Sequence, residues 1–159
     1  MKRVLLALDI QGNIKVSEMI LNVVNRIAEK IPTIATTLVK NPENPMADKE
    51  WLNWKAPSTD ITKVNTKYSY PRYGYTLPPV ILKTLEKNGI EEVLVVGAHT
   101  EAFLLSAGMQ LFDLGIKVSM IAPLVLTGQY HQHTVTLKIW EQSIGNVYET
   151  VAELDIGIS

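Results

Sequence analysis

Short apolar runs alternate with amphipathic segments along most of this chain, and this alternation constrains its fold more than any other feature. Val4 to Leu8 is an apolar run that ends in the polar turn 9–13, as expected for a strand buried on both faces of a parallel sheet. From Ser17 to Pro32 the apolar residues recur at helical spacing. Such strand-helix-strand units need right-handed crossovers, so the sequence predicts a three-layer α-β-α fold with a Rossmann-like parallel sheet of about six strands. Further strands are expected at 33–39, 60–66, 92–96 and 116–121, helices at 77–87, 100–114 and 130–143, and an edge strand or tail at 145–154.

Length and charge limit the kinds of protein this can be. The 159 residues, 47% of them hydrophobic, fit one domain spanning residues 1–159. A net charge of −1 gives no electrostatic footprint for nucleic acid or an anionic membrane, so neither is an expected partner. The first apolar run stops at Asp9, too early for a signal peptide or a membrane span, which favours a cytoplasmic protein.

Candidate functional residues follow the expected strands. In an open parallel sheet, ligands bind at the carboxyl ends of the strands, near the point where strand order reverses. Asp9 and Gln11 follow the first strand, residues 63–75 follow the expected third strand, and residues 97–103 follow the fourth. Between the second and third strands, residues 41–57 hold three prolines and two tryptophans without a clear period, which indicates a surface excursion.

These clusters, in this order, resemble the isochorismatase-like family of cysteine hydrolases, which includes isochorismatases, nicotinamidases and N-carbamoyl amide hydrolases. The family's D-x-Q signature corresponds to Asp9-Ile10-Gln11, and its G-x-x-T-x-x-C signature corresponds to Gly97 through Phe103. A later H-x-x-x-L element looks like residues 133–137. The resemblance spans most of the chain, although no single motif is decisive.

The resemblance implies an Asp, Lys and Cys triad in which a thiolate attacks a carbonyl and the aspartate is its base. Asp9 matches directly, although an aspartate after a strand is also a common turn residue. The lysine has two candidates, Lys67 ahead of Lys63, and a plain solvated lysine is a third interpretation. The cysteine position is occupied by Phe103, in a chain with no cysteine at all. A benzyl group cannot be deprotonated, so the family's covalent chemistry is excluded there.

Further residues are expected around this pocket. Backbone N–H groups of the turn before Phe103 would hold a developing oxyanion in the family. Substrate-contacting residues are expected at Gln11, Ala98, His99 and Thr100, although Thr100 is more typical of a helix N-cap. Ser106, one turn after Phe103, is a weak substitute nucleophile because the resemblance puts it at a packing position.

Cofactors and metals have little support in the sequence. His131 and His133 form an H-x-H pair, but no acidic residue is suitably spaced, and the D-x-H pattern of nicotinamidase-type members is absent from 36–45. There is no G-x-G-x-x-G or P-loop, so a nucleotide-binding Rossmann-like protein is the weakest hypothesis. We therefore expect no metal and no cofactor.

Two functional hypotheses remain. The leading one is an isochorismatase-like protein without thiol-dependent hydrolysis, acting as a binding, regulatory or structural homologue with a possible small-molecule ligand. The rival is a hydrolase of C–N, ether or ester bonds in which Asp9 activates water. A tyrosine cluster at 68–75 with Lys67 and Arg72 is compatible with a stacking surface for a planar ligand or a base, but the neutral charge balance favours a subunit or lid contact. The family resemblance implies a homo-oligomer.

Overall fold

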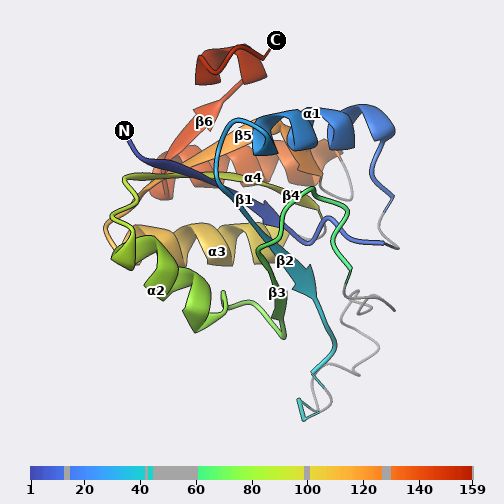
Figure 1. Ribbon diagram of the computed structural model, residues 1–159, viewed down its shortest axis with the longest axis vertical. Helices are drawn as coiled ribbons and strands as arrows, with labels where there is room; N and C mark the ends of the chain where they lie inside the picture. Colours follow the sequence, from blue (N-terminus) through green and yellow to red (C-terminus); the bar gives the residue numbers. More distant parts are fainter. Residues whose placement is uncertain (13–14, 42, 45–60, 99–100, 127–129, 159) are drawn as a thin grey trace.

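The computed structural model describes residues 1–12, 15–41, 43–44, 61–98, 101–126 and 130–158 (Figure 1). The described residues form a six-stranded sheet, parallel throughout, with the strand order β3-β2-β1-β4-β5-β6. The predicted α/β fold with a parallel sheet of about six strands is therefore confirmed. The strands are β1 (Arg3–Leu8), β2 (Thr33–Leu38), β3 (Ser69–Arg72), β4 (Glu92–Ala98), β5 (Lys117–Leu126) and β6 (Asn146–Tyr148).

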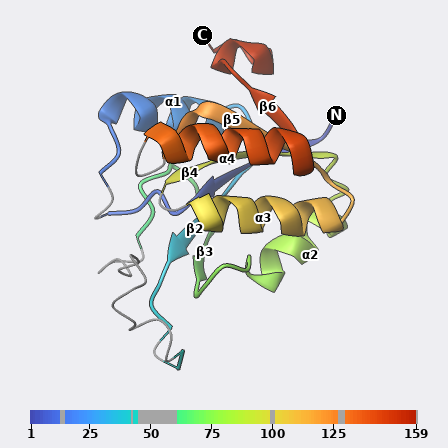
Figure 2. The same cartoon turned by 180° about the vertical axis from the view of Figure 1, so that it is seen from behind.

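Helices cover both faces of this sheet, as Figures 1 and 2 show from opposite sides. The helices are α1 (Glu18–Ala28), α2 (Pro79–Lys87), α3 (Glu101–Asp113) and α4 (Tyr130–Ser143), followed by the 3₁₀ helix η2 (Val151–Leu154). One face packs against α2, α3 and α4, and the other packs against α1 and η2. The sheet is therefore the middle of three layers.

The alternation of side chains along the strands divides the core into two halves. In β1, Val4, Leu6 and Leu8 belong to the α2-α3-α4 side, while Leu5 and Ala7 belong to the α1 side. Successive residues of a strand point to opposite faces, so an uninterrupted apolar run can fill both halves. None of these five residues exposes more than 5% of its surface.

Local signals fix the ends of several helices. Ser17 caps α1, because its hydroxyl accepts a hydrogen bond from the Ile20 backbone N–H at 3.2 Å. Gly115 follows α3 with φ of 74°, a left-handed conformation that glycine adopts without strain. Pro79 begins α2, where the missing N–H of proline costs no helical hydrogen bond.

The third strand lies later in the sequence than expected. Residues 60–66 were the expected strand, but Thr62 forms an isolated antiparallel bridge with Gln11, and β3 begins at Ser69. Pro71 is tolerated within β3 because this is an edge strand, where one side needs no partner. The carbonyl groups of Tyr68 and Arg72 accept hydrogen bonds from the backbone N–H groups of Ala35 in β2 and of Val39 just after it. The strand therefore ends at Arg72, which changes the residues delivered to the carboxyl edge.

A charged cluster around the buried Glu92 joins the amino ends of the central strands. Glu92, fully buried at the start of β4, accepts hydrogen bonds from Arg3 Nε at 2.7 Å and Ser119 Oγ at 2.6 Å, and pairs with Lys117 Nζ at 3.1 Å. Burial by itself raises the pKa of Glu92, but the hydrogen bonds from Ser119, Lys117 and Arg3, with the charge of Lys117, outweigh it and lower the pKa below its ordinary value.

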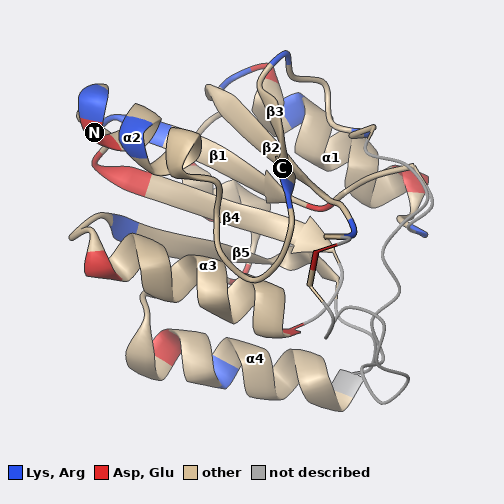
Figure 3. Ribbon diagram, turned by 90° about the horizontal axis from the view of Figure 1, so that it is seen from below, with Lys and Arg blue, Asp and Glu red and all other residues tan. Residues whose placement is uncertain are grey.

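Elsewhere, basic and acidic residues are interspersed along the described elements (Figure 3). Within those elements, no helix has both the length and the apolar character needed to cross a membrane.

Candidate functional site

Asp9 stands directly after β1, at the carboxyl edge of the sheet. Its backbone has φ of 56°, a left-handed conformation that aspartate tolerates better than most residues. Its backbone N–H donates to the Thr36 carbonyl at 3.1 Å, which continues the contact of β1 with β2. The residue is fully buried. The turn therefore directs the Asp9 side chain into the protein at the edge where the ends of β2 and β3 also lie.

Each oxygen of the Asp9 carboxylate has a partner. Thr36 Oγ1 donates to Oδ1 at 2.7 Å, and Arg72 Nη2 donates to Oδ2 at 2.6 Å. The Asp9 and Arg72 side chains both have no exposed surface. A buried charge is costly unless it is paired and hydrogen-bonded, and this carboxylate is both. The two partners come from the strands on the same side of β1, namely β2 and β3.

Arg72 connects this carboxylate to helix α3. Its Nη1 donates to the Phe103 carbonyl at 3.3 Å, and its guanidinium carbon lies 4.8 Å from the centroid of the Phe103 ring. A guanidinium over an aromatic face is attracted by the ring quadrupole, and this attraction strengthens away from water. Arg72 Nε is buried and has no hydrogen-bond partner among the described residues. One cation therefore contacts both Asp9 and Phe103.

Phe103 is the third residue of α3, and only 4% of its surface is exposed. On its outer side the ring stacks on Tyr75, with the centroids 4.7 Å apart and an interplanar angle of 24°. Ser106 Oγ donates to the Tyr75 carbonyl at 2.9 Å, which holds the chain before α2 against α3. The benzyl ring thus lies between a buried arginine and a half-exposed tyrosine.

The Gln11 side chain acts on the backbone of β2. Its Nε2 donates to the Leu38 carbonyl at 3.1 Å, and its Oε1 accepts from the Leu38 N–H at 2.6 Å. The amide thereby imitates a neighbouring strand and satisfies both backbone groups of one residue. Gln11 is fully buried, so its position supports the turn after β1.

The structure does not bring Lys67 to Asp9. Lys67 is exposed, and its Nζ lies 5.1 Å from the centroid of the Tyr68 ring. The backbone N–H of Lys63 donates to the Ile10 carbonyl in the antiparallel contact with residues 10–12. The cation that pairs with Asp9 is Arg72, which sequence reasoning assigned to an interface.

Arg72 was missed because the resemblance implies a lysine as the partner of Asp9, with Lys67 ahead of Lys63, and because the third strand was expected to end at Thr66. With a strand ending at Arg72, the last side chain of the strand enters the site. The spacing of Tyr68, Tyr70 and Arg72 carried this signal, because alternate residues share one face of a strand.

The remaining predicted residues are the substrate-contacting positions 98–100 and the two histidines of the H-x-H pair. Ala98 is buried at the end of β4, while His99 and Thr100, with the turn expected to hold an oxyanion, lie outside the described residues. His131 and His133 belong to the first turn of α4, where residues two apart point in different directions. Among the described residues, no group of three or more His, Cys, Asp or Glu side chains is placed to hold a metal ion.

Comparison with known proteins gives a match of fold. No protein-family model and no curated protein matches the sequence. Solved structures match over nearly the whole chain. An isochorismatase family protein from Burkholderia thailandensis has 16% identity and a TM-score of 0.78, covering 96% of this chain and 93% of that chain. The pyrazinamidase of Pyrococcus horikoshii, in complex with zinc, has 16% identity and a TM-score of 0.75, covering 93% and 99%.

A third similar structure is that of a ribonuclease. The MAR1 ribonuclease from Caenorhabditis elegans has 20% identity and a TM-score of 0.71, covering 98% of this chain and 79% of that chain. At these identities the similarity establishes the architecture, while activity depends on individual site residues. The fold expected from the order of the motifs is therefore confirmed.

Proposed function

We propose that this chain, which has the isochorismatase-like fold, is a homologue of those hydrolases without thiol-dependent hydrolysis, and that it serves as a binding, regulatory or structural protein. The observation that carries the proposal is the buried Phe103 ring, which lies over Arg72 at the position where the resemblance puts the nucleophile. The ring has no lone pair and no proton to give up. The chain has no cysteine that could replace it.

The environment of Asp9 also supports a loss of catalysis. A general base must come within hydrogen-bonding reach of the proton that it removes. Asp9 has no exposed surface, and Thr36 and Arg72 each occupy one of its carboxylate oxygens. Each oxygen keeps a second lone pair, but a water molecule attacking a substrate would have to reach it at a carboxylate with no exposed surface. This arrangement disfavours the rival hypothesis, in which Asp9 activates water.

The exchange of a lysine for an arginine fits the same proposal. An arginine guanidinium stays protonated at any ordinary pH, so Arg72 cannot exchange a proton during a reaction. Its planar group suits a permanent pair with a carboxylate and a stacking contact with an aromatic ring. Both contacts are present, to Asp9 and Phe103. The former site would then act as a structural link between β1, β3 and α3.

A hydrolysis screen on the pure protein tests this proposal. Amide and ester substrates of varied size should show no turnover above the rate in buffer. Turnover that disappears in Asp9→Asn, in protein that remains folded by circular dichroism, would overturn the proposal. Turnover that is unchanged in Asp9→Asn would point to a contaminant, and a second purification scheme would have to remove it.

We also propose that the chain forms a homo-oligomer through the outer face of α3. Met109 and Phe112 expose 47% and 57% of their surface there, on a helix that is apolar on most sides. A helix apolar all round is usually buried. Light scattering should give an assembly for the wild type and a smaller mass for Phe112→Lys. Met19→Lys is the control, because Met19 is an exposed apolar residue on another helix, α1, with 74% of its surface exposed.

A further inference from the structure

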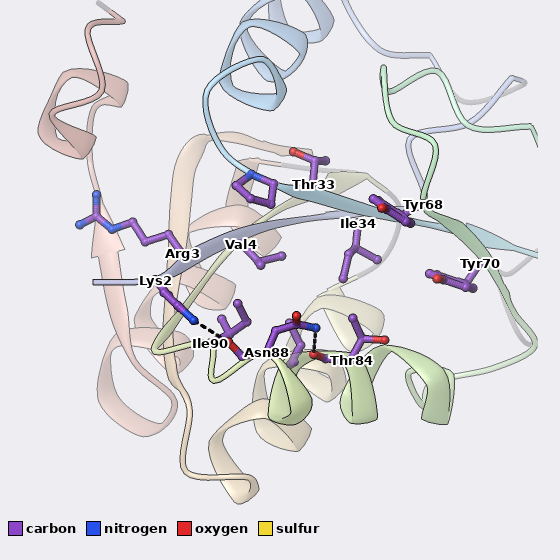
Figure 4. Close-up of a pocket in the computed structure, with 12 residues that line it drawn as sticks. Lys2, Arg3, Val4, Thr33, Ile34, Tyr68, Tyr70, Thr84, Asn88 and Ile90 are labelled. Atoms are coloured by element: carbon purple, nitrogen blue, oxygen red, sulfur yellow. Dashed lines mark hydrogen bonds between the residues drawn. The ribbon is translucent and has the colours of Figure 1, made fainter.

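A cavity lies at the amino-terminal edge of the sheet, opposite to Asp9. Its volume is about 680 Å³, within the range of small-molecule sites. It runs between α2 and the amino-terminal parts of β1, β2 and β3 (Figure 4). Lys2 lies at one end of this groove, and Tyr68 and Tyr70 lie at the other. None of its lining residues belongs to the Asp9 site.

The groove lies beside the face of β3 that carries Arg72, which is covered at the carboxyl end of the strand and open at the amino end. Tyr68, Tyr70 and Arg72 alternate along the chain and therefore point to the same face. Arg72 is covered by Phe103, whereas 49% of the Tyr68 surface is exposed. Helix α2 inserts Ile81 and Leu85 into the core, and its residues Thr84 and Leu85 line the groove together with Tyr68 and Tyr70.

The floor of the groove is apolar and belongs to the main core. Val4, Ile34 and Leu85 are buried residues of the core cluster, and Ile90 packs against them. Apolar surface that lines an open groove favours a ligand that removes it from water. The phenol hydroxyls of Tyr68 and Tyr70 have no hydrogen-bond partner among the described residues, so each can donate to a ligand.

The two basic residues that line the groove differ in whether their side chains form an ion pair. Arg3 is directed away from the groove in Figure 4, pairs with Glu92 at 2.7 Å and donates to the Leu154 carbonyl at 2.9 Å. Lys2 Nζ instead reaches the Asn88 carbonyl, at 3.3 Å, and forms no ion pair among the described residues, while the Glu91 carboxylate accepts a hydrogen bond from the Lys2 backbone N–H. The Lys2 ammonium group therefore supplies a positive charge without a direct carboxylate partner at the end of an apolar groove.

We propose that this groove binds a small aromatic anion: a planar ring system against Ile34 and the two tyrosines, with a carboxylate or sulfonate at Lys2. Aromatic rings pack on tyrosine with a preference beyond simple burial, which favours a planar body over an aliphatic chain. The ammonium group of Lys2 selects the anion over its neutral analogue. The site is independent of the chemistry at Asp9, so it stands whether or not the chain is a hydrolase.

A methyl-detected NMR titration of the full chain with 2-naphthoate tests the proposal. Saturable shifts are expected at Ile34, Leu85 and Ile90, with none at Ile27 on the opposite face of the sheet. The neutral analogue 2-naphthylmethanol and the aliphatic anion octanoate should each bind about fivefold more weakly or worse, since one exposed charge contact or one ring contact is missing.

Paired variants identify the residues that bind. Lys2→Gln should weaken binding of 2-naphthoate about fivefold, and Tyr68→Ala about tenfold. The matched controls are Lys83→Gln and Tyr73→Ala, exposed residues that do not line the groove, and they should bind as the wild type does. All four side chains are exposed, so unchanged melting temperatures are expected.

Three results would overturn the proposal. The first is the absence of saturable binding, and the second is equal affinity for 2-naphthoate and 2-naphthylmethanol. The third is a shift of the Ile34 and Ile90 signals with protein concentration alone, because the occupant would then be a second copy of the chain.

Discussion

Arg72 and Phe103 hold each other in place through two separate contacts. The guanidinium carbon lies 4.8 Å from the ring centroid, and Nη1 donates to the Phe103 carbonyl at 3.3 Å. The same guanidinium pairs with Asp9 at 2.6 Å. Contacts that share one group in this way are coupled, so changes to these residues should not be additive.

Removing one partner of the buried Asp9–Arg72 pair should destabilise the fold more than removing both charges. Arg72→Met leaves the Asp9 carboxylate buried without its cation, and we expect the free energy of unfolding to fall by about 3–5 kcal/mol. The double variant Asp9→Asn with Arg72→Met should recover part of this loss, because no charge remains buried. Urea denaturation measures both. Equal destabilisation by the single and double variants would contradict a buried ion pair between Asp9 and Arg72.

A thiol introduced at position 103 should have a lowered pKa. In Phe103→Cys the sulfur would lie in the first turn of α3, near the Arg72 guanidinium, and both features stabilise a thiolate. We expect a pKa below the ordinary value of about 8.5. Thiolate absorbance against pH measures it without interference, since the chain has no other cysteine.

Phe112→Cys is the matched control, because Phe112 is exposed near the other end of the same helix. Its thiol should titrate at the ordinary value or above it. Adding Arg72→Met to Phe103→Cys should raise the pKa again. If Phe103→Cys and Phe112→Cys titrate together, the site does not activate a thiol.

Glu92 should make the free energy of unfolding fall at low pH. Burial raises the pKa of Glu92, but the hydrogen bonds from Ser119, Lys117 and Arg3 outweigh burial, so its pKa in the folded chain is below the unfolded value. Its ionised form therefore stabilises the fold above the unfolded-state pKa, and this contribution is lost as the pH falls through the folded-state pKa. Between about pH 6 and pH 3, the wild type should lose more unfolding free energy than Glu92→Gln.

The control for this prediction is Glu91→Gln, the neighbouring carboxylate, whose side chain is 60% exposed. It should keep most of the wild-type dependence on pH. If Glu92→Gln follows the wild-type curve throughout, another group causes the dependence.

Gly97 should not tolerate a side chain. A Cβ at this position would lie 2.6 Å from the carbonyl oxygen and 2.8 Å from the Cβ of Leu8, the residue that pairs with Gly97 between β1 and β4. Gly97→Ala should therefore cost about 1–3 kcal/mol of unfolding free energy, as overpacked cores do. Thermal unfolding measures it against Gly74→Ala, whose Cβ would meet no atom within 4 Å. Similar melting temperatures would show that the strands can separate at little cost.

The regular part of the fold could be predicted because its signals are local. The apolar run at Val4 to Leu8 and the periodicity of α1 each depend on a few neighbouring residues, and α4 was expected at its observed bounds. β3 could not be predicted in this way, since it is a short edge strand of four residues that contains Pro71. Its position depends on pairing with β2, which is distant in the sequence.

The same contrast applies to the candidate site. Asp9 and Phe103 follow regular elements and could be placed from motifs, whereas Arg72 depends on where β3 ends. The structural roles of site residues were harder to predict than their positions. The side-chain amide of Gln11 binds the backbone of Leu38, a pairing that only the folded chain reveals, while its expected contact with a substrate stays a prediction.

The left-handed backbone at Asp9 has a consequence for interpreting related sequences. Most side chains would be strained at φ of 56°, while aspartate fits there and also receives hydrogen bonds from Thr36 and Arg72. The needs of the turn alone therefore favour an aspartate at this position, whether or not the carboxylate takes part in a reaction. A D-x-Q pattern after the first strand is accordingly evidence about the shape of a loop before it is evidence about turnover.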